Sequence, residues 1–370
     1  MAIDVAPNLS LIVNGVTYGG WKSIRVTQSM ESIAGSFDLD VSDRWGPADP
    51  WPIAEFDECE VQINGLTVID GYVSGRKLGG SSGTRTLSYR GRDRAAELVD
   101  CSVLVPDAST KGNKWTYRNL DLAAFAAQIA KQHDIKVSVQ PGLALSKVPV
   151  LVAHPGETGF EALKRAAGDT GALIVSDTAG GIVITGPGTT RATALIEGVN
   201  IKAADIDYDA SSRFHTYLVS SQPPGNDDAF GEATRVQAQA TDADVPRAGR
   251  VLLIRPDKGM DTATARRRAD WEARVRAAKS ASATITVRGW EQSTDGALWK
   301  INTLARVQAP RLIGVDGDML ISQVDFTVDD SGGQITQLHI VRPDAFTPEP
   351  HQQAAVSGEG AWKELAKGAL

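Results

Sequence analysis

The chain has 370 residues and a formal net charge of −7 at pH 7, from 45 acidic and 38 basic side chains. A sequence pI near 5.4 argues against bulk electrostatic binding of nucleic acid, because a phosphate backbone needs a basic field. A hydrophobic fraction of 42% is typical of a soluble globular protein, and the length predicts two or three domains. No apolar run approaches the ~20 residues of a membrane span, and the N-terminal MAIDVAPNLS does not resemble a signal peptide.

Residues 9 to 100 alternate apolar and polar side chains in short segments, which is typical of β-strands. Asn14-Gly15 and Asn64-Gly65 each separate two apolar runs and predict tight hairpin turns. In SFDLDVSDRW, Phe37 alternates with Asp38 and Asp40, so one face of this strand is apolar and the other acidic. Regularly spaced strands without helices between them predict an antiparallel barrel or sandwich.

The pattern changes after about residue 105. NLDLAAFAAQIAKQHDI predicts a helix with Asp121 near its start, and PGETGFEALKRAAGDTGAL predicts a second helix with Glu157 in its first turn. LIVSDTAGGIVITGPG predicts a hairpin, so residues 110 to 190 read as a small α+β insert. Strands return from about residue 200, interrupted by a basic helix over 262–279, and residues 345 to 370 read as a loose tail.

The first and last β regions run through similar segments in the same order. SFDLDVSDRW has a counterpart in ATITVRGWEQ, LTVIDGYVSGRKL in GDMLISQVDFTV, and SGTRTLSYRGRD in SGGQITQLHIVRPD. Identity between the paired segments is low, so a chance alignment of β patterns remains open as an alternative. A true duplication predicts two copies of one β domain flanking the insert.

Residue types that carry chemistry are scattered. Two cysteines, Cys59 and Cys101, are too few for a disulfide framework or a cysteine zinc site, and buried thiols are expected. The five histidines show no metal-ligand spacing, and His154 with Glu157 is interpreted as a helix start. No GxSxG, Walker-type or GxGxxG motif is present, so no catalytic residue, metal or cofactor is predicted. A carboxylate pair for peptidoglycan hydrolysis is neither supplied nor excluded by so many acids.

Several exposed basic and aromatic side chains are candidates for contacts with partners. Arg90, Arg92 and Arg94 of YRGRDR could pair with carboxylates of a neighbouring subunit. In the basic helix, Trp271, Val275 and Ala278 form the expected buried stripe. The arginines, Arg274 among them, suit a solvated or subunit-facing helix, with a DNA-binding helix as the alternative.

Tryptophans mark two further places. Trp45 and Trp51 flank the turn-rich GPADP, where they close the end of their own barrel or, alternatively, contribute to an interface. Trp362, in the terminal AWKELAKG, belongs either to a docking segment or to a frayed end.

An ordered set of segments resembles the baseplate hub proteins of contractile-tailed phages of the bacteriophage Mu type. The set comprises GWKSIRVTQSMESIAGSFDLDVSDRW, VIDGYVS, YRGRDRAAELVDCS, HPGETGFEAL, RFHTYLVSSQ, RADWEARVRAAKSASATITVRGW and GALWKINTLARV, and spans roughly residues 9 to 346. The resemblance, which extends to the T-even phage tail hub, implies an α+β, mainly β fold. Two tube-protein-like antiparallel β-barrel domains, 1–105 and 199–346, would flank an α+β insert at 106–198, with 347–370 as a flexible tail.

The resemblance implies a structural, non-enzymatic hub. Three chains with two tube-like domains each would form a pseudo-six-fold ring that joins the six-fold tail tube to a three-fold spike made by a separate chain. Expected partners are therefore the chain itself, the tail tube, the central spike and other baseplate proteins, in a virion tail assembled in the host cytoplasm without membrane insertion. DNA would pass without specific binding, and Asp38 and Asp40 are candidate acids lining the duct, where they would repel phosphates. The alternatives are a tail-associated peptidoglycan hydrolase and the equivalent hub of a contractile bacteriocin or secretion device.

Overall fold

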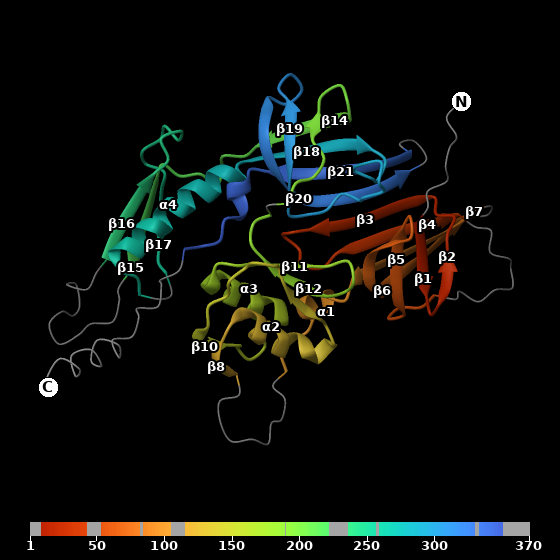
Figure 1. Cartoon of the computed structure of the whole chain (residues 1–370), viewed down its shortest axis with the longest axis horizontal. Helices are drawn as coiled ribbons and strands as arrows, with labels where there is room; N and C mark the ends of the chain where they lie inside the picture. Colours follow the sequence, from red (N-terminus) through yellow and green to blue (C-terminus); the bar gives the residue numbers. More distant parts are fainter. Residues whose placement is uncertain are drawn as a thin grey trace, which may run out of the picture. The chain divides into compact units, whose positions relative to one another are not determined.

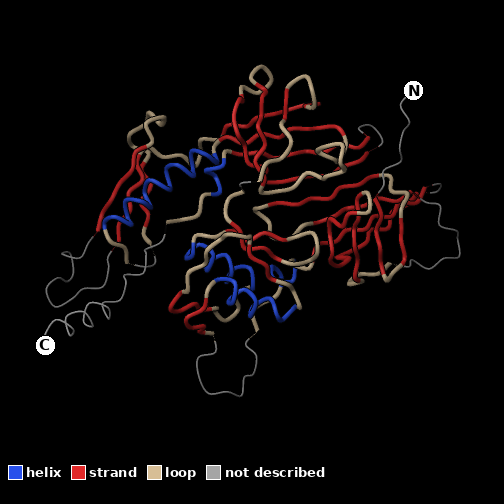
Figure 2. Tube along the Cα trace, viewed as in Figure 1, coloured by secondary structure: helices blue, strands red, loops and turns tan. Residues whose placement is uncertain are grey.

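The computed structural model describes residues 9–42, 53–81, 84–104, 115–188, 190–221, 236–256, 259–329 and 333–350. Two compact units are present: Met1–Ser212 with Val275–Pro348, and Arg213–Arg274 with Glu349–Leu370. Strands dominate the first unit, and the second combines three short strands with most of one long helix (Figures 1 and 2). The chain is therefore mainly β with an α+β part, as the sequence predicts. Within the described residues, no helix is long and apolar enough to cross a membrane.

The first β region follows the predicted alternation closely. Its strands are β1 (Leu9–Val13), β2 (Val16–Tyr18), β3 (Ser23–Ser29), β4 (Ser36–Ser42), β5 (Glu58–Ile63), β6 (Leu66–Ser81) and β7 (Thr84–Asp93). At both predicted hairpins, the Asn and the Gly have positive φ, between 50° and 78°. Such a turn needs two left-handed residues, which Asn and Gly supply at low cost, so both hairpin predictions are confirmed.

The second β region repeats the strand order of the first. Its strands are β13 (Leu195–Ile196), β14 (Ile201–Tyr208), β18 (Ala281–Arg288), β19 (Thr303–Ala309), β20 (Val315–Asp329) and β21 (Gly333–Val341). Neighbouring strands run β3-β4-β7-β6-β5-β1 in the first set and β14-β18-β21-β20-β19-β13 in the second. The sets differ at one end, because β1 pairs antiparallel with β5 whereas β13 pairs parallel with β19. Matching strand order supports a duplication rather than a chance alignment of β patterns.

The two sets join into one 13-stranded sheet through the antiparallel pairing of β3 with β20 (Figure 1). This pairing, hereafter the internal seam, runs from Gln323 opposite Ser29 to Val328 opposite Ile24. One hydrophobic core, with Phe37, Leu39 and Phe326 among its buried members, draws on both sets. Among the described strands, no pairing closes either set on itself, and the barrel shape stays a prediction.

The insert forms a small core of its own between the two sets in the chain. Its elements are α1 (Ala96–Asp100), β8 (Thr116–Leu120), α2 (Leu122–Ala130), the 3-10 turn η1 (Lys131–His133), β9 (Val137–Val139), β10 (Val148–Val152), α3 (Gly159–Thr170), β11 (Leu173–Ser176) and β12 (Ile182–Thr185). Asp121 caps α2 by accepting a hydrogen bond from the Ala124 N–H at 2.8 Å, as the sequence predicts.

The start of α3 differs from the expectation. The helix begins at Gly159 with Thr158 as its N-cap, and Thr158 and Glu161 form a capping box. Glu157 lies before the helix, where it accepts hydrogen bonds from the His154 N–H and from Arg165. Glu157 therefore stabilises the turn before the helix as a hydrogen-bond acceptor, and it does not lie in the first helical turn.

The second unit contains β15 (Thr216–Ser221), β16 (Val236–Thr241), β17 (Val251–Ile254) and most of α4 (Thr262–Lys279). Val219, Ala240, Ala265 and Ala269 are buried together in its core. The helix has the predicted bounds, and Val275 and Ala278 of the predicted stripe are buried. Trp271, the third member, is only half-buried, under Arg268, and Glu272 is buried beside the same arginine. The predicted boundaries at 105, 198 and 346 do not separate this unit, and that division stays a prediction.

Candidate functional site

The polar face of the first strand set carries a hollow lined by charged side chains. Alternation buries Phe37 and Leu39 and places the side chains between them on the opposite face of the sheet. There, β3, β4, β6 and β7 line a shallow hollow of about 570 Å³. The lining residues are Ser23, Arg25, Asp38, Asp40, Lys77, Ser88 and Arg90. The predicted outward orientation of Asp38 and Asp40 is therefore confirmed.

The charges in this hollow are mixed rather than acidic. Register places Asp38 opposite Arg25 on one side and Arg90 on the other. Partial burial, with the neighbouring Asp40, raises the pKa of Asp38, and the nearby cations Arg90, Arg25 and Lys77 act in the opposite direction. Three cations beside two carboxylates leave no net acidic field, so repulsion of phosphate by acids alone does not describe the hollow.

The same face continues across the internal seam onto the second set. Asp325 on β20 is 5% exposed and accepts hydrogen bonds from Thr27 on β3 and from Gln323 at 2.8 Å. His339 on β21 lies 3.1 Å from the same carboxylate. Burial alone would raise the pKa of Asp325, but these hydrogen bonds outweigh it and hold the pKa below its ordinary value. A buried, fully engaged carboxylate thus ties the two copies together.

The predicted arginine contacts have partners within the chain. Arg92 pairs with Asp100, and Arg94 donates to Asp70 at 2.9 Å and to the Tyr72 hydroxyl at 2.8 Å. Arg90 lies in the hollow, and Arg274 is exposed on α4. Trp45, Trp51 and Trp362 lie outside the described residues, so their interface role stays a prediction.

Asp93, which sequence reasoning overlooked, is the most perturbed carboxyl of the described residues. It is 1% exposed and accepts a hydrogen bond from the Gly35 N–H at 2.7 Å. Burial raises the pKa of Asp93 to about 7, and the backbone hydrogen bond offsets only part of that effect. A raised pKa suits a general acid, but an enclosed side chain cannot reach a cell-wall sugar, so Asp93 gives no support to a hydrolase.

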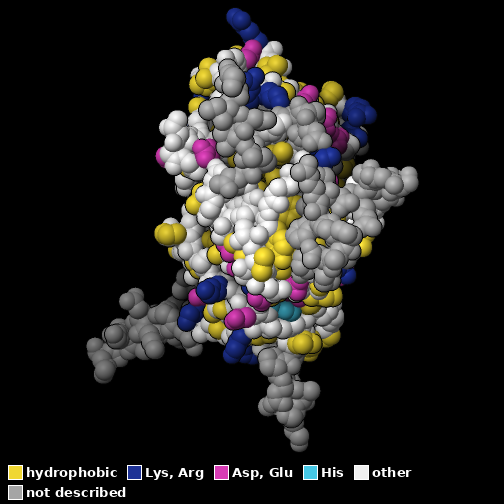
Figure 3. All heavy atoms as spheres, turned by 90° about the vertical axis from the view of Figure 1, so that its right-hand side faces the viewer, with side chains coloured by type: hydrophobic (Ala, Val, Ile, Leu, Met, Phe, Trp, Pro, Cys, Tyr) yellow, Lys and Arg dark blue, Asp and Glu magenta, His cyan; other side chains and the backbone are white. Residues whose placement is uncertain are grey.

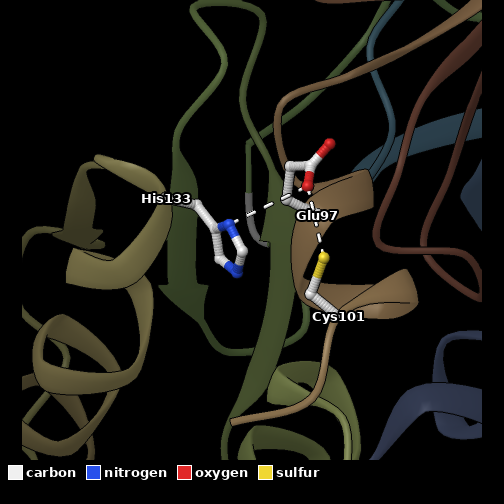
Figure 4. A group of neighbouring side chains, drawn as sticks. All are labelled: Glu97, Cys101 and His133. Atoms are coloured by element: carbon white, nitrogen blue, oxygen red, sulfur yellow. Dashed lines mark hydrogen bonds and ion pairs between the residues drawn. The ribbon is translucent and has the colours of Figure 1, made fainter. Parts of the chain in front are cut away.

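Three potential metal ligands converge in the insert, although their spacing gave no motif. Glu97 and Cys101 are four residues apart at α1, and His133 ends η1 (Figure 4). The Glu97 carboxylate lies 3.4 Å from the Cys101 sulfur and 3.8 Å from His133 Nδ1. Burial and Glu97 raise the pKa of the Cys101 thiol. The expectation of buried thiols is confirmed for Cys59, whose pKa burial raises to about 12, and is wrong for Cys101, which is half-buried.

Free strand edges are the remaining candidate contacts, and they too were not located from the sequence. Val73 of β6 exchanges backbone hydrogen bonds with Phe56 and Asp57, and beyond it β6 pairs with β7 on one side and with no described strand on the other. β14 pairs only with β18 among the described strands. An unpaired edge presents a row of backbone donors and acceptors to any strand that can reach it.

Comparison with known proteins defines the class of this chain as a baseplate protein of Mu-type phage tails. Residues 8–93 match the family model for the N-terminal domain of Mu phage baseplate assembly protein GpP-like proteins, and residues 261–349 match the fourth domain of GpP. Residues 95–186 match the second domain of baseplate hub protein gp44-like proteins. The chain is 30% identical to baseplate hub protein gp44 of Escherichia phage Mu, over 91% of this chain and 88% of the relative. It therefore belongs to the family of Mu-type baseplate hub proteins.

Two solved structures share the fold over nearly their whole length. The 43 kDa tail protein of prophage MuSo2 from Shewanella oneidensis has a TM-score of 0.80 at 33% identity, covering 92% of this chain and 99% of that one. The tail protein from Neisseria meningitidis MC58 has a TM-score of 0.77 at 22% identity, covering 94% and 100%. The resemblance predicted from seven sequence segments is thereby confirmed.

Proposed function

We propose that three copies of this chain form a pseudo-six-fold ring, which joins the hexameric tail tube to the trimeric spike of a phage baseplate. In this ring each chain occupies two of six similar places. The chain acts mechanically and catalyses no reaction. It belongs to the tail of the virion and is assembled there after synthesis in the host cytoplasm. A phage-derived bacteriocin or secretion device would use the chain in the same way.

The observation that carries this proposal is the internal seam between two strand sets of matching order. Two copies joined edge to edge place β3 of the first against β20 of the second. The strands at the corresponding positions, β14 and β6, keep a free edge among the described strands. Repeating the same join between chains is a heterologous contact, which closes into a ring when the rotation permits. Three chains with two copies each give six places, as the symmetry of the tube requires.

The continuous polar face supports a channel through the ring. It carries Arg25, Lys77 and Arg90 beside Asp38 and Asp40. Cations offset by neighbouring carboxylates have little net attraction for a phosphate backbone. We place this face toward the central channel, where DNA passes without being held. In Figure 3, basic and acidic side chains lie next to one another near the top and in the lower part of the visible face.

The remaining partners follow from the position of such a ring. One rim meets the tail tube and the other meets the spike, while the insert and the second unit contact the spike or other baseplate proteins. Arg274, Trp45, Trp51 and Trp362 are the side chains that we assign to these contacts.

The test is a mass measurement with electron microscopy of the purified chain, alone and co-expressed with its spike protein. The expected particle has three times the 39.3 kDa mass of one chain, and averaged images show a ring with a central opening. A chain that stays monomeric with the spike present would contradict the ring. Purified protein that clears cell-wall substrate, with the activity lost in a single Asp or Glu variant, would favour the hydrolase instead.

A further inference from the structure

We propose that the edge of β6 over residues 75–80, which no described strand covers, pairs antiparallel with β14 of a second copy of this chain, in the register of the internal seam. The proposal rests on the ring described above and identifies the strands, the register and the side chains that close it. The internal seam serves as the template, because it already joins the two copies within one chain. Two correspondences, one for each strand, transfer its register to the contact between chains.

The correspondence between β6 and β20 is fixed by a bulge that both strands carry at a serine. The pairing of β6 with β7 shifts between Val73 and Gly75, and the pairing of β20 with β21 shifts between Ile321 and Gln323. Ser74 and Ser322 are thus the bulged residues. Bulges are specific structural features, so one at the same place in both copies makes residues 75–80 equivalent to residues 323–328.

The correspondence between β14 and β3 follows from their partner strands. Phe37 of β4 lies opposite Gly91 of β7, whereas Ala283 of β18 lies opposite Ile340 of β21. Counted from the two bulges, Gly91 of β7 and Ile340 of β21 occupy equivalent positions. The residues opposite them, Phe37 and Ala283, are therefore equivalent as well. Val26 lies opposite Phe37 and Ile206 lies opposite Ala283, so Ile206 takes the place of Val26.

The transferred register places apolar side chains opposite each other. In the internal seam, Phe326 lies opposite Val26, and both are 0% exposed. The equivalent pair between chains is Leu78 with Ile206. Leu78 is 52% exposed in the single chain, although its counterpart Phe326 is fully buried. A large apolar side chain exposed at one copy and buried at the other is expected where a partner is missing.

Charge complementarity favours the same register. One step along the internal seam, Asp325 accepts the hydrogen bond of Thr27 from the opposite strand. The equivalent pair between chains is Lys77 with Asp207, which are both exposed. Shifting the register by one residue would turn every side chain to the other face and separate these charges. The apolar pair and the ionic pair therefore both favour the same register.

The first test reverses the charges at this pair. Lys77→Glu and Asp207→Lys are each expected to weaken the trimer roughly tenfold or more, because like charges then face each other, and the double variant is expected to restore it. Lys164→Glu, an exposed change on α3, is the control. Dissociation is followed by mass photometry or sedimentation. Single variants that assemble like the control, or a double variant that assembles no better than either single one, would overturn the pairing.

The second test is a disulfide between chains. Directly opposed residues lie about 4.5–5.5 Å apart, which suits a disulfide, so the variant Leu78→Cys with Ile206→Cys is expected to give covalent trimers on oxidation. Each single-cysteine variant is the control for the native thiols. A trimer that forms but cross-links no better than the controls would overturn the register and leave the ring standing. A chain that never forms trimers would overturn both.

A separate observation carries a second proposal: we infer that Glu97, Cys101 and His133 bind a zinc ion, with water as the fourth ligand. A tetrahedral zinc with ordinary bond lengths separates its ligand atoms by about 3.4–3.6 Å. The three ligand atoms lie within 4.8 Å of one another, and both measured distances to Glu97 lie within a few tenths of an ångström of that range (Figure 4).

The chemistry of the three groups favours zinc over harder ions. Thiolate and imidazole ligands suit zinc and other transition metals, while calcium and magnesium prefer oxygen ligands alone. The His133 side chain is 14% exposed and directs Nδ1 toward the Glu97 carboxylate, which is 40% exposed and leaves room for a water. Such an ion would tie α1 to the end of α2.

The test is a titration of the full chain with Zn²⁺, and with Co²⁺ as a spectroscopic probe. One equivalent is expected to bind, with a sulfur-to-cobalt charge-transfer band. Cys101→Ser and His133→Gln are expected to lose both, whereas His154→Gln, an exposed histidine of the same insert, keeps them. No binding to the native chain, or unchanged binding by Cys101→Ser, would overturn the site.

Discussion

At the scale of single residues, alternation along a strand determines which charges face the core. In β7 the odd-numbered side chains Leu87 and Tyr89 are buried, and the even-numbered Arg90 is exposed. Asp93 shares the odd parity and is buried with them. A carboxylic acid at an inward position therefore carries the desolvation cost of its charge, which is reduced when the group holds a proton.

We predict that the stability of the unit containing Asp93 falls as pH rises from about 4 to about 7. The folded pKa of about 7 lies above the ordinary value near 3.9, so the stabilising contribution is complete below pH 4 and is lost by pH 7. The free energy of unfolding should fall by on the order of 4 kcal/mol over this range. Asp93→Asn should flatten the dependence in urea titrations at several pH values.

Asp134→Asn, at an exposed left-handed position that suits asparagine, is the matched control and should keep the native pH profile. An Asp93→Asn variant with the native profile would show that another group is responsible.

The alternation of buried and exposed side chains along a strand also explains what could be predicted from sequence at this scale. It placed Asp38 and Asp40 on the polar face, and applied to YRGRD it would have marked Asp93 as buried. It could not show that Arg94 meets Asp70, or that Glu97 meets His133, because these contacts depend on how separate elements pack.

At the scale of elements, local signals predicted the hairpins and helices, and distant pairings escaped prediction. Asn-Gly turns and the Asp121 cap lie within a few residues of the structure they specify. The internal seam joins residues almost 300 positions apart, such as Thr27 and Asp325, and depends on backbone groups that every residue carries. In the sheet of the second unit, β15 pairs with the later strand β17, and no local sequence pattern predicts this pairing.

We predict that alanine substitutions at the two equivalent edge positions change the stability of the isolated chain by very different amounts. Phe326→Ala removes a fully buried ring in the internal seam and should lower the free energy of unfolding by about 3–5 kcal/mol. Leu78→Ala removes a half-exposed side chain and should change it by less than about 1 kcal/mol. Urea unfolding at concentrations where the chain is monomeric measures both.

In trimer assembly, the relative importance of the two positions should be the reverse of that in monomer stability. Leu78→Ala should weaken the trimer, while a folded Phe326 variant with a smaller change, Phe326→Leu, should assemble almost normally. Equal losses of monomer stability at both positions would show that Leu78 is already packed within the isolated chain and lacks no partner there.

At the scale of the whole molecule, the net charge of −7 does not describe the hollow, where cations and carboxylates lie side by side. We predict that the double variant Asp38→Asn with Asp40→Asn gains affinity for duplex DNA, because Arg25, Lys77 and Arg90 lose the carboxylates that offset them. Fluorescence anisotropy at 50 and 200 mM salt measures the gain, which should shrink steeply at the higher salt.

Asp134→Asn is again the control, since its charge lies outside the hollow. Native protein that binds DNA as strongly as the double variant would contradict the role given to the two aspartates.

The internal seam has a mechanical consequence for the proposed ring. Of its six joints, three would lie within a polypeptide and three between polypeptides, in strict alternation. Covalent continuity protects the first kind, so a load on the ring can part it only at every second joint. The weak joints would then have three-fold symmetry, and a three-fold spike pressing on the ring would load all of them equally.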